Sequence, residues 1–268
     1  MTPLVLQLRI HGLSVGLSLL GLYLGLGGGV GTMVVALAGR RAGVSARTAL
    51  ALCFWAASVG IIAARLGGMF GGGTSHGLPL AMSYAVGLAA ACAAAAAFAR
   101  SRELSPWLAL DLLGCGLAAA HAVALLGCFA VGCCYGRIAP TGAPFAVTFG
   151  QGTIAWQELA ARGIVPLAAR STPPLYAVQP IEAVALAILT LLLVVYVRRP
   201  RGGRVLGAYL VGCACIWVGL ASWRAQPWHG VATVTCLAAA GIALTLRGHA
   251  HRTVSARRAR TGTDPRRV

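Results

Sequence analysis

The residues best suited to chemistry lie at the end of a long apolar run, in the segment LGCFAVGCCYGR (126–137). This segment puts three cysteines, a tyrosine and an arginine where a membrane helix must end. Further along the chain, Gln179 and Glu182 stand at the start of the next apolar run. Polar groups are costly to keep at the edge of a bilayer, so all of these residues are candidates for a functional site.

Glu182 needs a partner, because it lies about one turn into its apolar run and an unpaired carboxylate is strongly disfavoured there. Arg137 and Arg224 lie at the same predicted depth. Arginine can hold a phosphate with two parallel hydrogen bonds, and a carboxylate can fix the arginine, so the three residues suit a phosphodiester head group. The alternative is a buried ion pair that only clamps two helices together.

Cysteine together with histidine is the ligand chemistry of zinc. The adjacent residues Cys133 and Cys134 cannot both point at one ion from a continuous helix, so we expect no metal; a disulfide between the two remains open. His121 and Cys128 are seven residues apart and share a helix face. His121 is either a base in the chemistry or a hydrogen-bonding residue between helices.

The composition identifies the elements that must position these groups. The chain is 58% hydrophobic and 10% charged, with a mean hydropathy of +0.80, which excludes an ordinary soluble domain. We therefore expect an all-α, polytopic membrane protein with about seven transmembrane helices of roughly 20 residues each. The predicted spans are residues 13–38, 48–66, 79–98, 107–131, 179–197, 205–223 and 229–246. Residues 1–246 form the membrane domain, and residues 247–268 form a basic cytoplasmic tail.

The arginines predict the orientation. The chain has no lysine, and 16 of its 22 arginines fall on one side of the predicted spans. By the positive-inside rule, that side is cytoplasmic, so the N-terminus lies outside and the C-terminus inside. The net charge of +17 thus follows membrane topology, and we expect no nucleic-acid partner. The tail either lies against anionic lipid or solubilises the chain.

A structured outer loop, about residues 136–178, is predicted between the fourth and fifth spans. The segment PFAVTF (144–149) is typical of a short strand, and TIAWQELAARG (153–163) of a short amphipathic helix. Outer loops of this length usually recognise something. The site is therefore expected to face outward.

Three segments resemble the prolipoprotein diacylglyceryl transferase family in its cysteine-rich form. They are ALLGCFAVGCCYGRIAPT (124–141), PFAVTF (144–149) and YAVQPIEA (176–183). The resemblance implies an enzyme of the bacterial inner (plasma) membrane that needs no cofactor. Such an enzyme moves the diacylglyceryl group of phosphatidylglycerol to the cysteine thiol of a lipobox-containing precursor protein and releases glycerol phosphate.

The resemblance also implies roles for particular residues. Arg137, with Arg224, would hold the phosphate, and Glu182 and Gln179 would orient the arginines. The base would be His121 or His11. The remaining residues of the matched motif would line the substrate site, namely Cys128, Tyr135 and Gly136.

The sequence departs from the family at charged positions. One family arginine falls on Leu125 and a second falls near Trp217, while the histidine of a later motif becomes Tyr176. These losses favour the alternative of a non-catalytic family member that binds phospholipid or a lipoprotein partner. A third hypothesis is a redox or metal-handling membrane protein that uses Cys128, Cys133 and Cys134.

Overall fold

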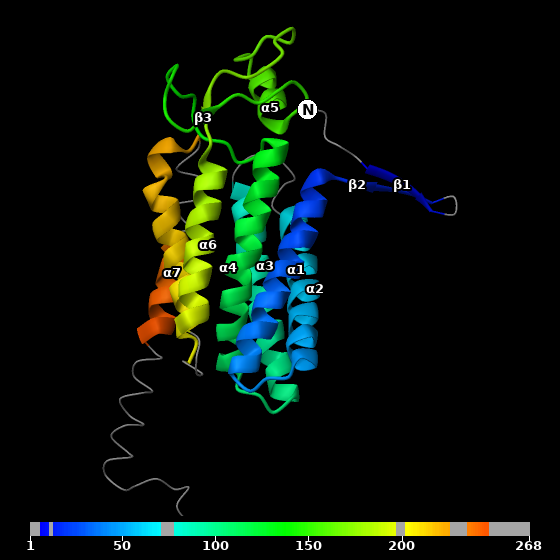
Figure 1. The fold of residues 1–268 in the computed structure, drawn as a ribbon, viewed down its shortest axis with the longest axis vertical. Helices are drawn as coiled ribbons and strands as arrows, with labels where there is room; N and C mark the ends of the chain where they lie inside the picture. The colour runs from blue at the N-terminus through cyan, green and yellow to red at the C-terminus, as the bar shows by residue number, and fades with distance from the viewer. Residues whose placement is uncertain (1–5, 11–12, 71–77, 197–201, 226–234, 247–268) are drawn as a thin grey trace, which may run out of the picture.

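Long runs of leucine, alanine and glycine form helices here, because a helix pairs its own backbone polar groups inside an apolar surrounding. A computed structural model describes residues 6–10, 13–70, 78–196, 202–225 and 235–246. Within these residues, the long helices run side by side in a bundle, and a cap of loops covers one end of it (Figure 1).

The described residues include five helices that are long and apolar enough to cross a membrane. Two further apolar helices are shorter, and they fall where the sixth and seventh spans were predicted. The all-α, polytopic membrane fold predicted from hydropathy is confirmed. The long helices are α1 (Leu19–Arg41), α2 (Ala46–Phe70), α3 (Leu78–Ser101), α4 (Pro106–Val131) and α6 (Val178–Tyr196), and the shorter ones are α7 (Arg204–Gly219) and Thr235–Leu246.

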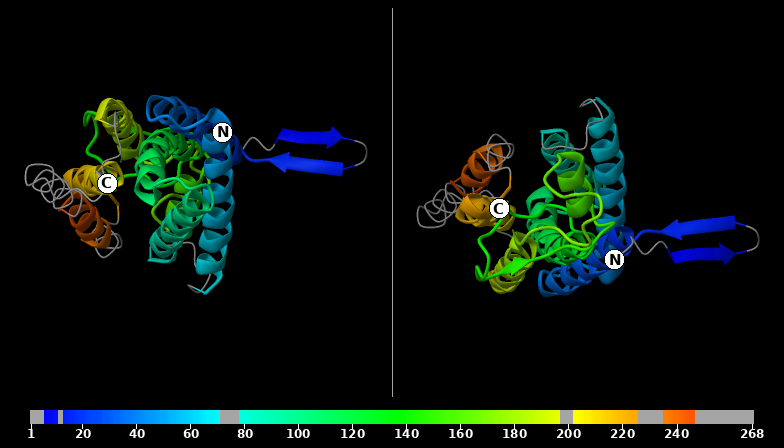
Figure 2. Two further views of the ribbon diagram at one scale, coloured as in Figure 1. Left: turned by 90° about the horizontal axis from the view of Figure 1, so that it is seen from below. Right: turned by 90° about the horizontal axis from the view of Figure 1, so that it is seen from above.

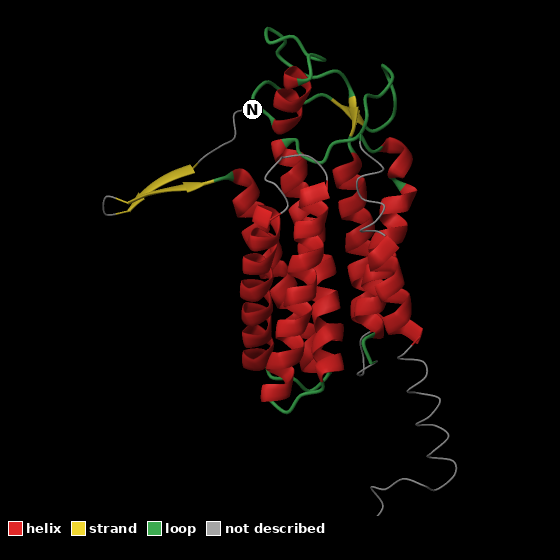
Figure 3. Ribbon diagram, turned by 180° about the vertical axis from the view of Figure 1, so that it is seen from behind, coloured by secondary structure: helices red, strands yellow, loops and turns green. Residues whose placement is uncertain are grey.

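The first predicted span, residues 13–38, was placed too early. Strands β1 (Leu6–Ile10) and β2 (Leu13–Leu17) form an antiparallel hairpin instead (Figure 3). Apolar residues alternate with other residues in both strands, which is the period of a strand rather than a helix. Helix α1 begins at Leu19, because the Ser18 side chain accepts a hydrogen bond from the backbone of the first turn.

Helix α4 is the centre of the bundle, and it packs against α1, α3, α6 and α7 (Figure 2). Close packing of α4 against α1 depends on small residues. A Cβ atom on Gly116 would lie 2.5 Å from the Cγ2 atom of Val35, and one on Gly31 would lie 2.7 Å from the carbonyl oxygen of Gly116. The two helices therefore approach each other closely, as small residues allow in membranes.

The two ends of the bundle differ in structure. The connections α1–α2, α3–α4 and α6–α7 meet at one end, and the α4–α6 connection covers the other (Figure 1). Arg40, Arg41, Arg100 and Arg204 lie at the ends of helices on the first side. Consecutive helices therefore run in opposite directions, as in a chain that crosses back and forth.

Asp111 has a structural role at the arginine-rich end. Its buried carboxylate accepts hydrogen bonds from the backbone N–H groups of Val205, at 2.8 Å, and Gly203, at 3.3 Å. These are free donors at the start of α7, and a carboxylate there also favours the helix dipole. Asp111 on α4 therefore fixes where α7 begins.

The α4–α6 connection has its own small core. Helix α5 (Ile154–Ala161) confirms the short helix predicted in this loop. The predicted strand over 144–149 shortens to β3 (Ala146–Val147), which pairs with β4 (Leu175–Tyr176). Buried residues hold the loop together, among them Tyr135, Phe149, Trp156, Leu159 and Leu175. The tail, residues 247–268, and His11 lie outside the described residues.

Candidate active site

Helix α4 ends in a left-handed glycine, and this ending shapes the site. Gly132 has φ of 76°, and Cys133 donates its N–H to the carbonyl oxygen of Cys128 at 2.9 Å. A Cβ atom on Gly132 would lie 3.1 Å from the ring of Phe149, so glycine also allows the loop to pack closely. Cys134, with φ of 55°, then turns the chain away from the helix axis.

This turn brings three thiols together. The Sγ atoms of Cys128, Cys133 and Cys134 all lie within 4.8 Å of one another. Cys128 and Cys133 are half-buried, and Cys134 is exposed. Helix α4 ends at Val131, so no continuous helix runs through Cys133 and Cys134, and the premise on which no metal was expected is wrong. All nine cysteines are free, so no disulfide joins Cys133 to Cys134.

The three thiols differ in acidity. Hydrogen bonds from the thiols of Cys128 and Cys133 hold the pKa of Cys134 well below its usual range, and the charge of Arg224 acts in the same direction. The same sulfur–sulfur hydrogen bonds raise the pKa of Cys133. Cys134 is therefore the first of these two thiols to lose its proton.

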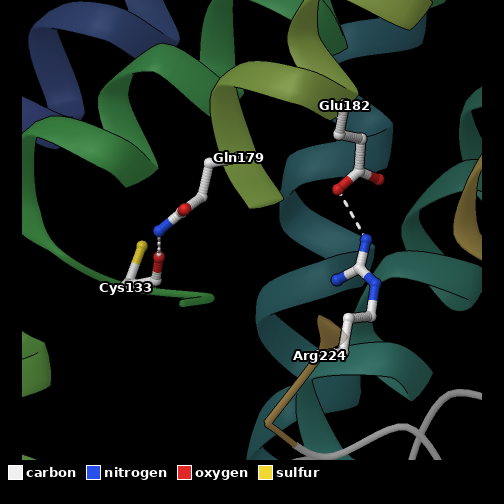
Figure 4. Close-up of polar contacts among 4 residues, drawn as sticks. All are labelled: Cys133, Gln179, Glu182 and Arg224. Atoms are coloured by element: carbon white, nitrogen blue, oxygen red, sulfur yellow. Dashed lines mark hydrogen bonds and ion pairs between the residues drawn. The ribbon is translucent and has the colours of Figure 1, made fainter. Parts of the chain in front are cut away.

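Gln179 connects the start of α6 to the cysteine turn. Its Nε2 atom donates a hydrogen bond of 2.7 Å to the carbonyl oxygen of Cys133 (Figure 4). The side chain is fully buried, and its Oε1 atom has no hydrogen-bond partner among the described residues. A buried acceptor without a donor is uncommon and calls for an explanation such as a ligand.

Glu182 lies one turn further along α6 and pairs with Arg224 (Figure 4). The Nη2 atom of Arg224 lies 2.5 Å from Oε2 of Glu182, and the two side chains are only 13% and 9% exposed. Arg224 also stacks over the ring of Trp217 at 4.8 Å, while its buried Nε atom has no partner in the described part of the chain. The prediction that Glu182 needs an arginine partner is confirmed.

Arg137 is placed differently from Arg224. It is exposed, its guanidinium lies 5.9 Å from the ring centre of Tyr176, and no ion pair joins it to Glu182 in the described structure. Of the two predicted arginines, Arg224 alone contacts the carboxylate. Arg137 is thus an exposed cation at the same end of the bundle.

Backbone hydrogen bonds at Gly136 and Arg137 join the segment of Arg137 to the segment of Arg224. Its N–H donates to the carbonyl oxygen of Tyr176 at 2.9 Å, and the next N–H, of Arg137, donates to that of Trp223 at 2.8 Å. A Cβ atom on Gly136 would lie 2.5 Å from both carbonyl oxygens, so no larger residue fits. The rings of Tyr176 and Trp223 stack at 5.2 Å with an angle of 8°.

Trp223 is a site residue that the sequence argument did not single out. It stacks on Tyr176, and its carbonyl positions the backbone of Arg137. The available signal was a tryptophan beside an arginine at the end of an apolar run, where aromatic residues gather at the membrane interface.

His121 lies deeper in the bundle than the ion pair. It is seven residues, or about 10 Å along the helix, from Cys128. Its Nδ1 atom lies 3.4 Å from the hydroxyl of Tyr209, which in turn lies 2.9 Å from that of Tyr84. Among the described residues, no hydrogen bond or ion pair joins His121 to Glu182 or Arg224.

Two of the residues from the matched motif face the protein interior. Tyr135 is buried in the loop core and donates a hydrogen bond of 2.8 Å to Oε2 of Glu158 on α5. Burial, and the adjacent Glu158, raise the pKa of this phenol. Leu125, at the position where the resemblance places an arginine, is buried in the apolar core around α4.

These features define a polytopic membrane protein with a polar site at one end of its helix bundle. The family model of the prolipoprotein diacylglyceryl transferases matches residues 8–248, and the chain therefore belongs to that family. No curated protein matches the sequence. Membership places the chain in a family of membrane transferases of lipoprotein biosynthesis.

Proposed function

We propose that this chain transfers the diacylglyceryl group of phosphatidylglycerol to the thiol of a lipobox cysteine, at the outer face of the bacterial inner membrane. The proposal depends on two buried polar atoms that have no hydrogen-bond partner among the described residues, namely Nε of Arg224 and Oε1 of Gln179. One is a charged donor and the other an acceptor, and a phosphoglycerol head group offers a counterpart to each.

The ion pair suits the phosphate part of the head group. Glu182 uses one amino group of Arg224 and fixes the guanidinium plane, while Nε has no acceptor within the described part of the chain. Arg137, exposed at the same end, is the second cation for the phosphate. Gln179 is held by Cys133, so its free oxygen is directed for accepting a hydrogen bond from a glycerol hydroxyl.

The reaction is an alkylation of a thiol. The acceptor thiol gives its proton to a base, and the thiolate attacks the glycerol carbon that carries the phosphate oxygen. A carbon–sulfur bond forms, the carbon–oxygen bond breaks, and glycerol phosphate leaves with the electron pair. The arginines stabilise the charge that grows on the leaving phosphate. His121, held by Tyr209, is our candidate base within the described residues, and His11 is the candidate outside them.

The orientation of the chain follows from its arginines. We propose that the arginine-rich end is cytoplasmic, so that the N-terminus and the site face outward. The site would then meet phosphatidylglycerol in the outer leaflet and a precursor that has already crossed the membrane.

A second candidate function is phospholipid binding without transfer. The buried Leu125, at a family arginine position, favours it, and so does the low exposure of the Glu182–Arg224 pair. Such a protein would bind phosphatidylglycerol or a lipoprotein partner and would release no glycerol phosphate.

The test is transfer in proteoliposomes that contain phosphatidylglycerol, with a lipobox peptide as acceptor. We expect the mass of the peptide to increase by one diacylglyceryl group. In Gln179→Leu we expect the rate of transfer to fall at least about tenfold, because the variant loses the hydrogen bond of the amide nitrogen to Cys133 and the proposed hydrogen bond of the amide oxygen to the lipid. Glu103→Gln, an exposed change at the opposite end of the bundle, is the matched control. Saturable lipid binding without a mass change would support the second candidate instead.

A further inference from the structure

The three thiols at the end of α4 are the only group of metal-ligating side chains of this kind among the described residues. Their sulfur atoms lie within 4.8 Å of one another. Zinc binds thiolate sulfur at about 2.3 Å, so three sulfurs on one tetrahedral ion are about 3.8 Å apart. None of the three sulfur–sulfur distances would therefore have to shorten by more than about 1 Å for the thiolates to share one ion.

We propose that Cys128, Cys133 and Cys134 bind one Zn²⁺ ion through three thiolates, and that the fourth position of the ion accepts the thiol of the lipobox cysteine. The second half of this proposal rests on the proposed function, and the first half does not. Three protein ligands with one open position are the usual arrangement of a catalytic zinc ion, whereas structural zinc sites use four.

The surroundings of the thiols suit such an ion. Zn²⁺ with three thiolates carries one net negative charge, and the positive charge of Arg224 acts on Cys134. Gln179 holds the backbone of Cys133 by its carbonyl oxygen, which fixes the middle ligand from outside the cluster. Cys134 is exposed, so the open position has access to a substrate.

The ion would activate the acceptor of the proposed reaction. A thiol that coordinates zinc loses its proton outright, and the proton passes to His121 or to water. The bound thiolate then attacks the glycerol carbon, the carbon–sulfur bond forms, and glycerol phosphate leaves with the electrons of the carbon–oxygen bond. The charge of the zinc ion does not change, and no oxidant or reductant is needed.

The first experiment measures metal binding alone. The full chain is purified in detergent without chelators, and its zinc content is determined by mass spectrometry. We expect about one ion per chain, and at least about tenfold weaker binding in Cys134→Ser and in Cys128→Ser. Cys215→Ser, an exposed thiol on α7, is the matched control and should keep the ion. Elution as a single monodisperse species shows that each variant is folded.

The second experiment measures the open position with Co²⁺ in place of zinc. Three thiolates give Co²⁺ a characteristic visible spectrum, and a lipobox peptide should change it, whereas the same peptide with serine for cysteine should not. No ion in the folded wild-type chain, or a disulfide among the three thiols, would overturn the site. A bound Co²⁺ ion whose spectrum does not change when the cysteine peptide is added would refute the proposal that the fourth position of the ion accepts the substrate thiol. Neither readout needs turnover, so a failure of transfer alone would refute the proposed function and leave the zinc site standing.

Discussion

The buried ion pair between Glu182 and Arg224 makes a quantitative prediction about stability. Replacing Glu182 by glutamine keeps the shape of the side chain and leaves the arginine charged and without its counter-ion. The two side chains are 9% and 13% exposed, so water can solvate the abandoned charge only slightly. Breaking a buried pair on one side costs about 3–5 kcal/mol, and we expect Glu182→Gln to lower the free energy of unfolding by that amount.

A second variant separates charge from packing. In Glu182→Gln/Arg224→Met the charge is removed on both sides, and we expect the double variant to recover at least about 2 kcal/mol of the loss. Stability is measured by equilibrium unfolding in mixed micelles, followed by tryptophan fluorescence. Glu103→Gln, exposed at the other end of the bundle, should change stability by less than about 0.5 kcal/mol.

The same pair of variants tests whether the ion pair is more than a clamp. If its role is to present Arg224 to a phosphate, the double variant regains stability but not binding of phosphatidylglycerol. The reasoning is refuted if Glu182→Gln is as stable as the wild type, or if the double variant is no more stable than the single one. Recovery of lipid binding together with stability would reduce the pair to a helix clamp.

Three further predictions concern the elements that position the site. Asp111→Ala leaves two buried backbone donors at the start of α7 without an acceptor, and unfolding should show a loss of about 1–3 kcal/mol. Gly136→Ala forces a Cβ atom to 2.5 Å from two carbonyl oxygens, so lipid-binding assays should show at least about tenfold weaker binding while circular dichroism keeps the helical signal. Tyr135→Phe removes a hydrogen bond to a carboxylate and should cost about 1.5–3 kcal/mol at pH 8. Because the folded pKa of Tyr135 is raised, this contribution is complete below the ordinary value of 10.0 and declines above it, so wild type and variant should converge as the pH rises.

Hydropathy predicted the helices well because a membrane leaves few alternatives. Runs of about 20 apolar residues must pair their backbone groups internally, and five long helices fall where five of these runs were expected. The error at the first span has a local cause. Apolar residues alternate with other residues over 6–10 and 13–17, as they do in strands, and the high overall apolarity concealed that period.

The predicted depth in the membrane narrowed the partner of Glu182 to two arginines, but it could not decide between them. Arg137 and Arg224 are equivalent in a hydropathy profile, since it records distance from the membrane centre and not direction. The backbone pairing of Gly136 with the segments of Tyr176 and Trp223 decides the outcome. Such pairing joins residues far apart in the chain, and no local pattern in one sequence reveals it.

The thiol cluster, in contrast, could have been predicted from a local signal, the glycine at the end of the fourth apolar run. Gly132 precedes the adjacent cysteines and ends the helix with a left-handed turn. Glycine after a long apolar run is a common helix stop. If Gly132 is taken as the end of the helix, Cys133 and Cys134 lie beyond it and need not point in different directions.

Catalytic transfer can be tested on the wild-type chain by following the peptide and the released head group together. The wild-type chain is reconstituted with isotope-labelled phosphatidylglycerol and a lipobox peptide, and the peptide mass is followed together with released glycerol phosphate. We predict labelled diacylglyceryl peptide and glycerol phosphate in equal amounts. An unchanged peptide, with phosphatidylglycerol bound and intact, would contradict the claim and identify a lipid-binding member of the family.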